Sequence, residues 1–143
     1  MLMAYEDVYI ANVSIGADPE QTLRAFNEAE SYDGPSVIIA YTHSKAHGID
    51  MTQPAQYHKA AVQSGQWLLY RHDPRNAGKQ EPILSLDSAE PCLQVKYYLE
   101  MEKRFSIMNT QSNSDDFIES HQDWINRRYS WFKAKSSEKL KSV

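Results

Sequence analysis

The fold is decided by residues 35–50, which read Pro-Ser-Val-Ile-Ile-Ala-Tyr-Thr-His-Ser-Lys-Ala-His-Gly-Ile-Asp. Residues 37–40 form a short continuous apolar run, which is typical of a strand buried on both faces of a parallel sheet. Polar residues follow at once, and open α/β sheets bind their ligands beyond the carboxyl ends of the strands. The sequence therefore predicts a functional site directly after this strand. Its candidate residues are Thr42, His43, Ser44, Lys45 and His47.

The preceding residues predict a strand and a helix that lead into this run. Residues 8–13 are rich in β-forming side chains and predict a strand. Asp18 is expected to cap the following helix, with Gln21 as its capping-box partner. Helical spacing directs Leu23 and Phe26 toward the sheet. A strand, a helix and a strand with such short connections predict a right-handed βαβ unit with parallel strands.

The same alternation continues beyond the polar cluster. A second helix is expected to begin at Thr52 or Gln53 and to end before Gly65. Its thin apolar face consists of Tyr57, Ala60, Ala61 and Val62. Residues 67–70 predict a third strand. Residues 1–75 are therefore expected to form a partial α/β domain with a parallel sheet.

The composition changes after residue 75. Residues 76–92 are rich in Gly, Pro and polar side chains, which predicts an extended crossing segment. Residues 93–143 predict a helical extension of two helices, of which Ser114 caps the second. The apolar stripe of that second helix repeats every seven residues, at Ile118, Ile125 and Phe132. A broad aromatic surface is expected to need a partner, and it includes Tyr97, Trp124 and Trp131.

The totals restrict the class of protein. A chain of 143 residues has the length of one domain. Its net charge of -4 argues against nucleic acid as a partner, because such partners favour a basic face. The single cysteine excludes an internal disulfide and fits a reducing compartment. No stretch approaches the roughly 18 apolar residues of a membrane span, and no basic segment precedes the apolar first residues. We therefore expect a cytoplasmic protein without a membrane partner.

The polar cluster allows several kinds of chemistry. His43 and His47 are four residues apart and precede Asp50, so on a helix the two imidazoles would suit a metal ion. Gly48 instead favours a loop, in which both imidazoles would bond to backbone groups. Ser44 lies beside His43, but no Gly-x-Ser-x-Gly motif surrounds it, which argues against a hydrolase nucleophile. No dinucleotide or P-loop glycine motif occurs. The spacing alone assigns no catalytic, cofactor-binding or metal-binding residue.

The remaining candidates have structural interpretations. Cys92 lies between Pro91 and Leu93 and is expected to be a small packed side chain rather than a reactive thiol. Three further histidines fall in helices or at strand ends, where a structural role is expected. They are His58, His72 and His121.

The chain also resembles the C-terminal region of pyruvate:ferredoxin (flavodoxin) oxidoreductases. Residues 8–17 read VYIANVSIGA and residues 29–41 read AESYDGPSVIIAY, and both segments are similar to segments of that family. The similarity continues through His43, residues 46–49, residues 61–65, Trp67, residues 69–71, residues 73–75, residues 86–88 and the closing helices. It covers nearly the whole chain.

The resemblance implies a large enzyme with thiamine pyrophosphate, magnesium and four-iron four-sulfur clusters. Such an enzyme converts pyruvate to acetyl-CoA and carbon dioxide and passes the electrons to ferredoxin or flavodoxin. This chain would correspond to the C-terminal half of the thiamine-diphosphate-binding-type domain and to the helical extension after it. The Gly-Asp-Gly segment that holds the metal and pyrophosphate would lie upstream.

One residue departs from the family pattern. The resemblance implies a cysteine that binds the iron-sulfur cluster at the position of Ser44, and a serine hydroxyl is a poor replacement for a thiolate. Cys92 does not align with a ligand position. We therefore expect the chain alone to bind no cofactor and to be inactive. Two hypotheses remain open: a split or C-terminal piece of the enzyme that needs the missing portion or a homo-oligomer, or a non-catalytic remnant that serves interaction or assembly.

Overall fold

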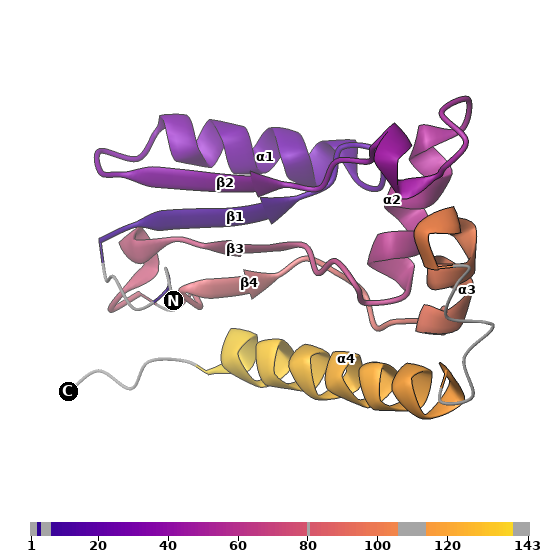
Figure 1. The fold of residues 1–143 in the computed structure, drawn as a ribbon. Helices are drawn as coiled ribbons and strands as arrows, with labels where there is room; N and C mark the ends of the chain where they lie inside the picture. The colour runs from indigo at the N-terminus through magenta and orange to yellow at the C-terminus, as the bar shows by residue number, and fades with distance from the viewer. Residues whose placement is uncertain (1–2, 4–6, 80, 106–113, 139–143) are drawn as a thin grey trace.

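The computed structural model describes residues 3, 7–79, 81–105 and 114–138 (Figure 1). A four-stranded sheet forms its centre, with α1 and α4 alongside the sheet and α2 and α3 beyond one end of it. The elements in chain order are β1 (Tyr9–Val13), α1 (Pro19–Glu30), β2 (Ser36–Ala40), the 3-10 helix η2 (Lys45–His47), α2 (Pro54–Gln63), β3 (Tyr70–His72), the 3-10 helix η3 (Pro74–Asn76), β4 (Leu84–Leu86), α3 (Val95–Met101) and α4 (Ser114–Ser137).

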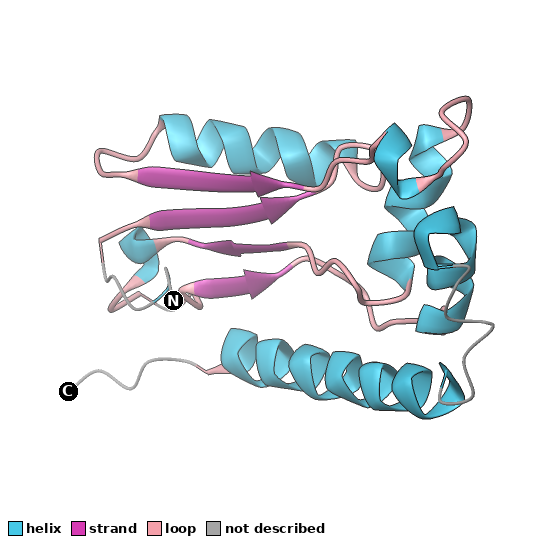
Figure 2. Cartoon of the chain, in the orientation of Figure 1, coloured by secondary structure: helices cyan, strands magenta, loops and turns pink. Residues whose placement is uncertain are grey.

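The sheet is mixed, whereas the sequence predicted a parallel one. β1 and β2 are parallel and pair Tyr9 with Ser36 and Val13 with Ala40, which confirms the parallel strand–helix–strand unit. β3 then pairs antiparallel with β1, and β4 pairs antiparallel with β3. The prediction is wrong here because α2 lies beyond the carboxyl ends of β1 and β2, so the chain re-enters the sheet from that end (Figure 2).

The strand buried on both faces is β1 rather than β2. The strand order is β2-β1-β3-β4, which places β2 at an edge, and its residues are only partly buried. All five residues of β1 are buried. Successive side chains of β1 point to opposite faces. Tyr9, Ala11 and Val13 therefore pack with Ala25 of α1 on one face, and Ile10 packs with residues of α4 on the other.

The third strand begins later than expected, at Tyr70 instead of Trp67. The reason is that the residues before Tyr70 make other bonds: Trp67 N donates to Ala61 O at 2.9 Å, and Leu69 N donates to Ser88 Oγ at 2.7 Å. The expected crossing segment, residues 76–92, contains the strand β4. β4 pairs with β3 and contacts α4.

Helix α1 begins as predicted but is rotated about its axis. Asp18 Oδ1 accepts a bond from Gln21 N at 2.9 Å, which confirms the cap. The Gln21 side chain donates to Asn12 O and Asp87 Oδ2 and so does not complete a capping box. Leu23 and Phe26, expected to face the sheet, are 63% and 53% exposed. The helix instead approaches β1 through small or polar side chains, which are Gln21, Thr22 and Ala25.

The apolar stripe of α4 is buried largely as the sequence predicted. Ile125 and Phe132 of α4 are buried, while Trp124 and Trp131 are 44% and 50% exposed. Ile125 joins α4 to a cluster formed by α2 and α3, which includes Ala60, Ala61, Val95, Tyr98 and Leu99. Within the described ranges, we find no helix with both the length and the apolar character needed to cross a bilayer.

Candidate functional site

The predicted site lies where β1 and β2 end side by side, next to α2 (Figure 2). Tyr41 N donates to Val13 O at 2.9 Å and so extends the parallel pairing by one residue. The chain then leaves the sheet as a loop. Ser44 Oγ accepts a bond from Ala46 N at 3.2 Å and caps η2, and Gly48, with a φ of 71°, ends it. These turns keep the polar side chains at the carboxyl ends of the strands.

Ser14, His58 and His43 form a hydrogen-bonded chain at this end of the sheet. Ser14 Oγ lies 2.8 Å from His58 Nδ1, and His58 Nε2 lies 2.8 Å from His43 Nδ1. Ser14 is fully buried and His58 is nearly so, whereas His43 is half-buried in the loop after β2. The chain therefore leads from the interior of the domain to its surface at the strand ends. We call Ser14, His58 and His43 the serine–histidine chain.

Burial and the neighbouring His43 lower the pKa of His58. A neutral imidazole has one donor and one acceptor nitrogen, so a neutral His58 can link Ser14 and His43 with either tautomer. Gly16 allows the ring to lie here, because a Cβ atom on Gly16 would come within 2.7 Å of His58 Cγ.

Aromatic rings hold His58 in place. The Tyr41 ring meets the His58 ring edge-on, with centroids 4.9 Å apart. Trp67 also packs against Tyr41, at 5.5 Å between ring centroids, and its Nε1 donates to Val13 O at 3.0 Å. These contacts fix the orientation of an imidazole whose two nitrogens already have partners.

A second polar chain connects Tyr41 to α3 and the residues after it. The hydroxyls of Tyr41 and Tyr98 are 3.1 Å apart, and Tyr98 Oη donates to Glu102 Oε1 at 2.8 Å. Glu102 is 1% exposed and also accepts a bond from Arg104 Nε. Burial raises the pKa of both tyrosines. They therefore remain protonated donors at neutral pH and tie α3 to the end of β2.

The other predicted site residues have separate local roles. Thr42 Oγ1 donates to the carbonyl of His43 at 3.3 Å. Lys45 and His47 form part of η2, and the buried Nδ1 of His47 has no hydrogen-bond partner within the described ranges. Asp50 Oδ1 accepts bonds from the backbone N and the hydroxyl of Thr52, and these bonds lower its pKa. The structure thus joins His43 to His58 rather than to His47.

The fit to a metal ion is poor. In the part of the chain that the structure describes, no three His, Cys, Asp or Glu side chains come together as a metal site.

Cys92, expected to be packed, is exposed. The reason is that its backbone N donates to Gln63 O at 2.9 Å, which fixes the segment, while the thiol itself lies at the surface.

Two members of the serine–histidine chain were missed by the sequence reasoning. His58 was expected to be structural, and Ser14 was not singled out. The signal for Ser14 was present, since it directly follows β1 and therefore obeys the strand-end rule that identified residues 42–47. His58 had no local signal, because its contact with His43 spans fifteen residues.

A third polar cluster lies nearer the middle of the sheet and has a structural role. Arg71 Nε and Nη2 donate to the two oxygens of Asp87 at 2.9 and 2.8 Å, and Nη1 donates to Glu28 Oε1. Tyr9 Oη donates to the other Glu28 oxygen at 2.8 Å. Burial and Glu28 raise the pKa of Tyr9. This cluster connects α1, β1, β3 and the residue after β4.

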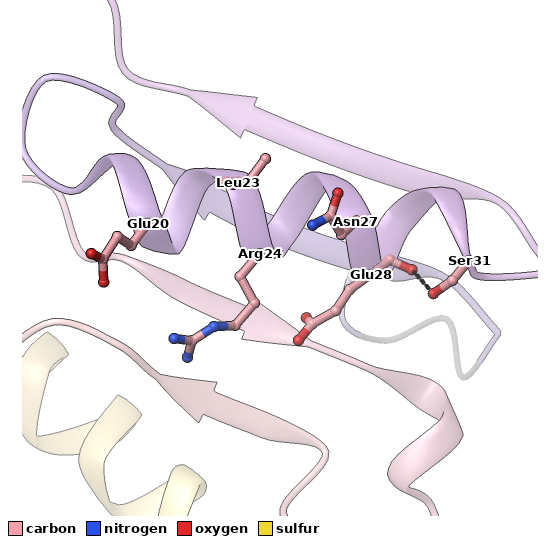
Figure 3. A pocket seen from close by; sticks show the side chains of 6 residues that line it. All are labelled: Glu20, Leu23, Arg24, Asn27, Glu28 and Ser31. Carbon is pink, nitrogen blue, oxygen red and sulfur yellow. Dashed lines mark hydrogen bonds between the residues drawn. The ribbon is translucent and has the colours of Figure 1, made fainter.

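A shallow groove runs along α1, away from the strand ends (Figure 3). It has a volume of about 430 Å³ and is lined by Glu20, Leu23, Arg24, Asn27, Glu28 and Ser31. All six residues belong to α1 or its cap, so the groove is a feature of one exposed helix face. It does not reach the serine–histidine chain.

Comparison with known proteins shows which proteins this chain resembles in sequence. No protein-family model matches the chain. The pyruvate-flavodoxin oxidoreductase of Nostoc sp. is 47% identical over 108 residues, which are 76% of this chain and 9% of the relative. That of Trichormus variabilis is 42% identical over 135 residues, which are 92% of this chain and 11% of the relative.

A third relative carries the ferredoxin name. The pyruvate:ferredoxin oxidoreductase of Moorella thermoacetica is 40% identical over 111 residues, which are 78% of this chain and 10% of the relative. The chain thus spans about a tenth of the length of the curated relatives it matches. On this identity over most of its residues, the chain belongs to the pyruvate-flavodoxin oxidoreductase family and matches a segment of it.

Proposed function

We propose that this chain is the C-terminal piece of an oxidoreductase that oxidatively decarboxylates pyruvate and passes the electrons to flavodoxin or ferredoxin. In this proposal it works only together with a polypeptide that carries the remaining portion. The observation that carries the proposal is 40–48% identity over most of this chain, against relatives that are about ten times longer. The serine–histidine chain at the strand ends lies where an α/β domain of this kind keeps its chemistry.

The residues described here do not fit the cofactors of the family by themselves. Ser44 Oγ caps η2 and offers a hydroxyl where an iron-sulfur cluster needs a thiolate. The sequence contains no Gly-Asp-Gly segment for thiamine pyrophosphate and its magnesium ion. The part of this chain in the proposed enzyme is therefore to complete the domain and to present His43, backed by His58, at the strand ends.

A second candidate function follows from the presence of Ser44 where the resemblance implies a cluster cysteine. A chain that has lost the cluster cysteine but keeps exposed aromatic side chains on its helices would suit a non-catalytic interaction or assembly module. Tyr97 and Trp131 are 56% and 50% exposed, and large apolar patches on a protein surface mark contact sites. Under this reading the chain binds the partner without supporting turnover.

One reconstitution experiment separates the two candidates. The Nostoc relative is truncated so that its matched 108 residues and everything after them are removed, and it is co-expressed with this chain. Pyruvate- and CoA-dependent reduction of flavodoxin is then measured with thiamine pyrophosphate and magnesium. Turnover by the pair, and by neither part alone, supports the enzyme. A stable complex without turnover supports the interaction module, and the absence of any complex contradicts both.

A matched variant tests the role given to Ser44. Ser44→Cys supplies the thiolate that the resemblance implies, and Ser44→Ala removes the hydroxyl without supplying one. In the reconstituted pair, the cysteine variant should contain more iron and sulfide than the wild type, and the alanine variant should not. Equal iron content in all three would show that position 44 is no cluster ligand.

A further inference from the structure

The open edge of the sheet at β2 is a candidate binding surface. Among the residues that the structure describes, β2 pairs only with β1. Tyr9 N donates to Pro35 O, and Tyr41 N donates to Val13 O, so the odd-numbered residues of this stretch turn their backbone groups toward β1. The backbone N–H and C=O groups of Ser36, Ile38 and Ala40 therefore point away from β1, along the free edge.

The residues of β2 are those of an interior strand. Proteins protect exposed strand edges with charged side chains, prolines or a covering helix. Residues 36–40 read Ser-Val-Ile-Ile-Ala and contain neither a charge nor a proline. The opposite edge strand, β4, has α4 packed beside it. A continuous apolar run is typical of strands that have neighbours on both sides in a parallel sheet.

The flank of α1 above this edge is also apolar and exposed. Glu28 lies on the flank of α1 that faces β3, because its side chain bonds to Arg71. At about 100° per residue, Phe26 lies on the opposite flank, on the side of β2, and Leu23 lies between that flank and the outer face of the helix. Leu23 and Phe26 are 63% and 53% exposed. Exposed apolar side chains therefore lie on α1 near the free edge of the sheet, on the face of the sheet that α1 covers.

We propose that the free edge of β2 and the Leu23–Phe26 flank of α1 bind a strand of the missing portion of the enzyme, which extends the sheet by β-augmentation. This inference rests on the proposed function and names the surface through which the two polypeptides join. The partner contributes an unpaired strand, which bonds to Ser36, Ile38 and Ala40, and an apolar surface, which covers Leu23 and Phe26. The length of the relatives beyond the matched segment supplies such a partner.

Ala40 offers a clean test, because its backbone N–H points outward and the residue is exposed. Ala40→Pro removes the outward donor and leaves the pairing of β1 with β2 unchanged. Ala40→Ser keeps the donor and serves as the control. The probe is the truncated Nostoc relative, immobilised and titrated with each variant. We expect Ala40→Pro to bind at least tenfold more weakly than the wild type and Ala40→Ser to bind equally. The untruncated relative should bind none of them.

A second variant tests the same surface without touching the backbone. Leu23→Glu places a charge on the proposed contact and should also weaken binding at least tenfold. Gln63→Glu adds the same charge at an exposed position of α2 and should not. The urea midpoint of each variant shows whether it is folded.

The outcomes separate this inference from the proposed function. If the wild type binds and supports turnover but Ala40→Pro and Leu23→Glu bind equally well, the surface is wrong and the proposed function stands. If the wild type neither binds nor supports turnover, both are wrong. If sedimentation shows a dimer of the chain that Ala40→Pro abolishes, the occupant of the edge is a second copy, which overturns the inference.

Discussion

Gly65 at the end of α2 is predicted to be one of the most sensitive positions in the chain. Its φ of +75° is left-handed, and a Cβ atom there would lie 2.7 Å from Ile125 Cγ2 and 2.8 Å from Pro91 Cγ. Gly78 provides a matched control, with a φ of +77° and no atom within 4 Å of its Cβ position. An L-residue in this conformation costs about 1–2 kcal/mol. Replacement of glycine by alanine regains about 0.4–1 kcal/mol through the unfolded chain.

Gly78→Ala should therefore lower the free energy of unfolding by no more than about 1.5 kcal/mol. Gly65→Ala carries the same cost and must also displace Ile125, which is fully buried in the cluster between α2, α3 and α4. Overpacking of this kind costs about 1–3 kcal/mol more. Equilibrium urea unfolding, followed by circular dichroism at equal m-values, measures the difference between the two variants. Equal free energies of unfolding for the two variants would refute the close packing of Ile125 of α4 against Gly65 at the end of α2.

Three further predictions concern the polar clusters. Arg71→Met leaves Asp87 and Glu28 without their cation, so it should lower the free energy of unfolding by about 3–5 kcal/mol at pH 7. A loss below about 1 kcal/mol in urea titrations would show that these ion pairs do not stabilise the fold as argued. Tyr98→Phe removes the donor to buried Glu102 and should cost about 1–3 kcal/mol in the same assay, whereas Tyr97→Phe, at an exposed position, should cost almost nothing. Burial and His43 lower the pKa of folded His58 below its unfolded value of about 6.5, so the unfolded state binds a proton more readily. The contribution of His58 to the free energy of unfolding should therefore be fully present above about pH 6.5. It should decrease as the pH falls below about 6.5, by at most about 1.4 kcal/mol per pH unit. His58→Gln should reduce the pH dependence of the free energy of unfolding between about pH 7.5 and 5. An unchanged slope would contradict this role of His58.

The sequence predicted those features that depend on neighbouring residues. The cap at Asp18, the parallel pairing of β1 with β2 and the buried stripe of α4 follow from local spacing, and all three are present. The strand-end rule that pointed to the residues after β2 is also local, and it led to His43, which belongs to the serine–histidine chain. His43 and His47 were expected to act together because they are close in sequence, whereas His43 in fact pairs with His58 of α2. Contacts of that separation carry no local signal.

The direction of β3 was missed for a related reason. An apolar run predicts a strand but not its orientation, which depends on where the preceding helix ends. Here α2 ends beyond the carboxyl edge of the sheet, so the returning strand is antiparallel. The residues from Trp67 to Leu69 have the composition of a strand, but they are bonded to α2 and to Ser88 instead.

Two further wrong predictions concern neighbouring elements, β2 and α1. β2 was expected to be buried on both faces, and Leu23 and Phe26 were expected to be covered, yet β2 is only partly buried and both side chains of α1 are exposed. A strand paired to the free edge of β2 would account for them together, since it would satisfy the outward backbone groups and allow Leu23 and Phe26 to be buried. Full burial of such side chains is worth about 1.5–3 kcal/mol each, so the exposed halves of these two would contribute roughly 1–1.5 kcal/mol each. The apolar pattern of β2 and α1 is thus consistent with a sheet one strand wider than the one this chain forms alone.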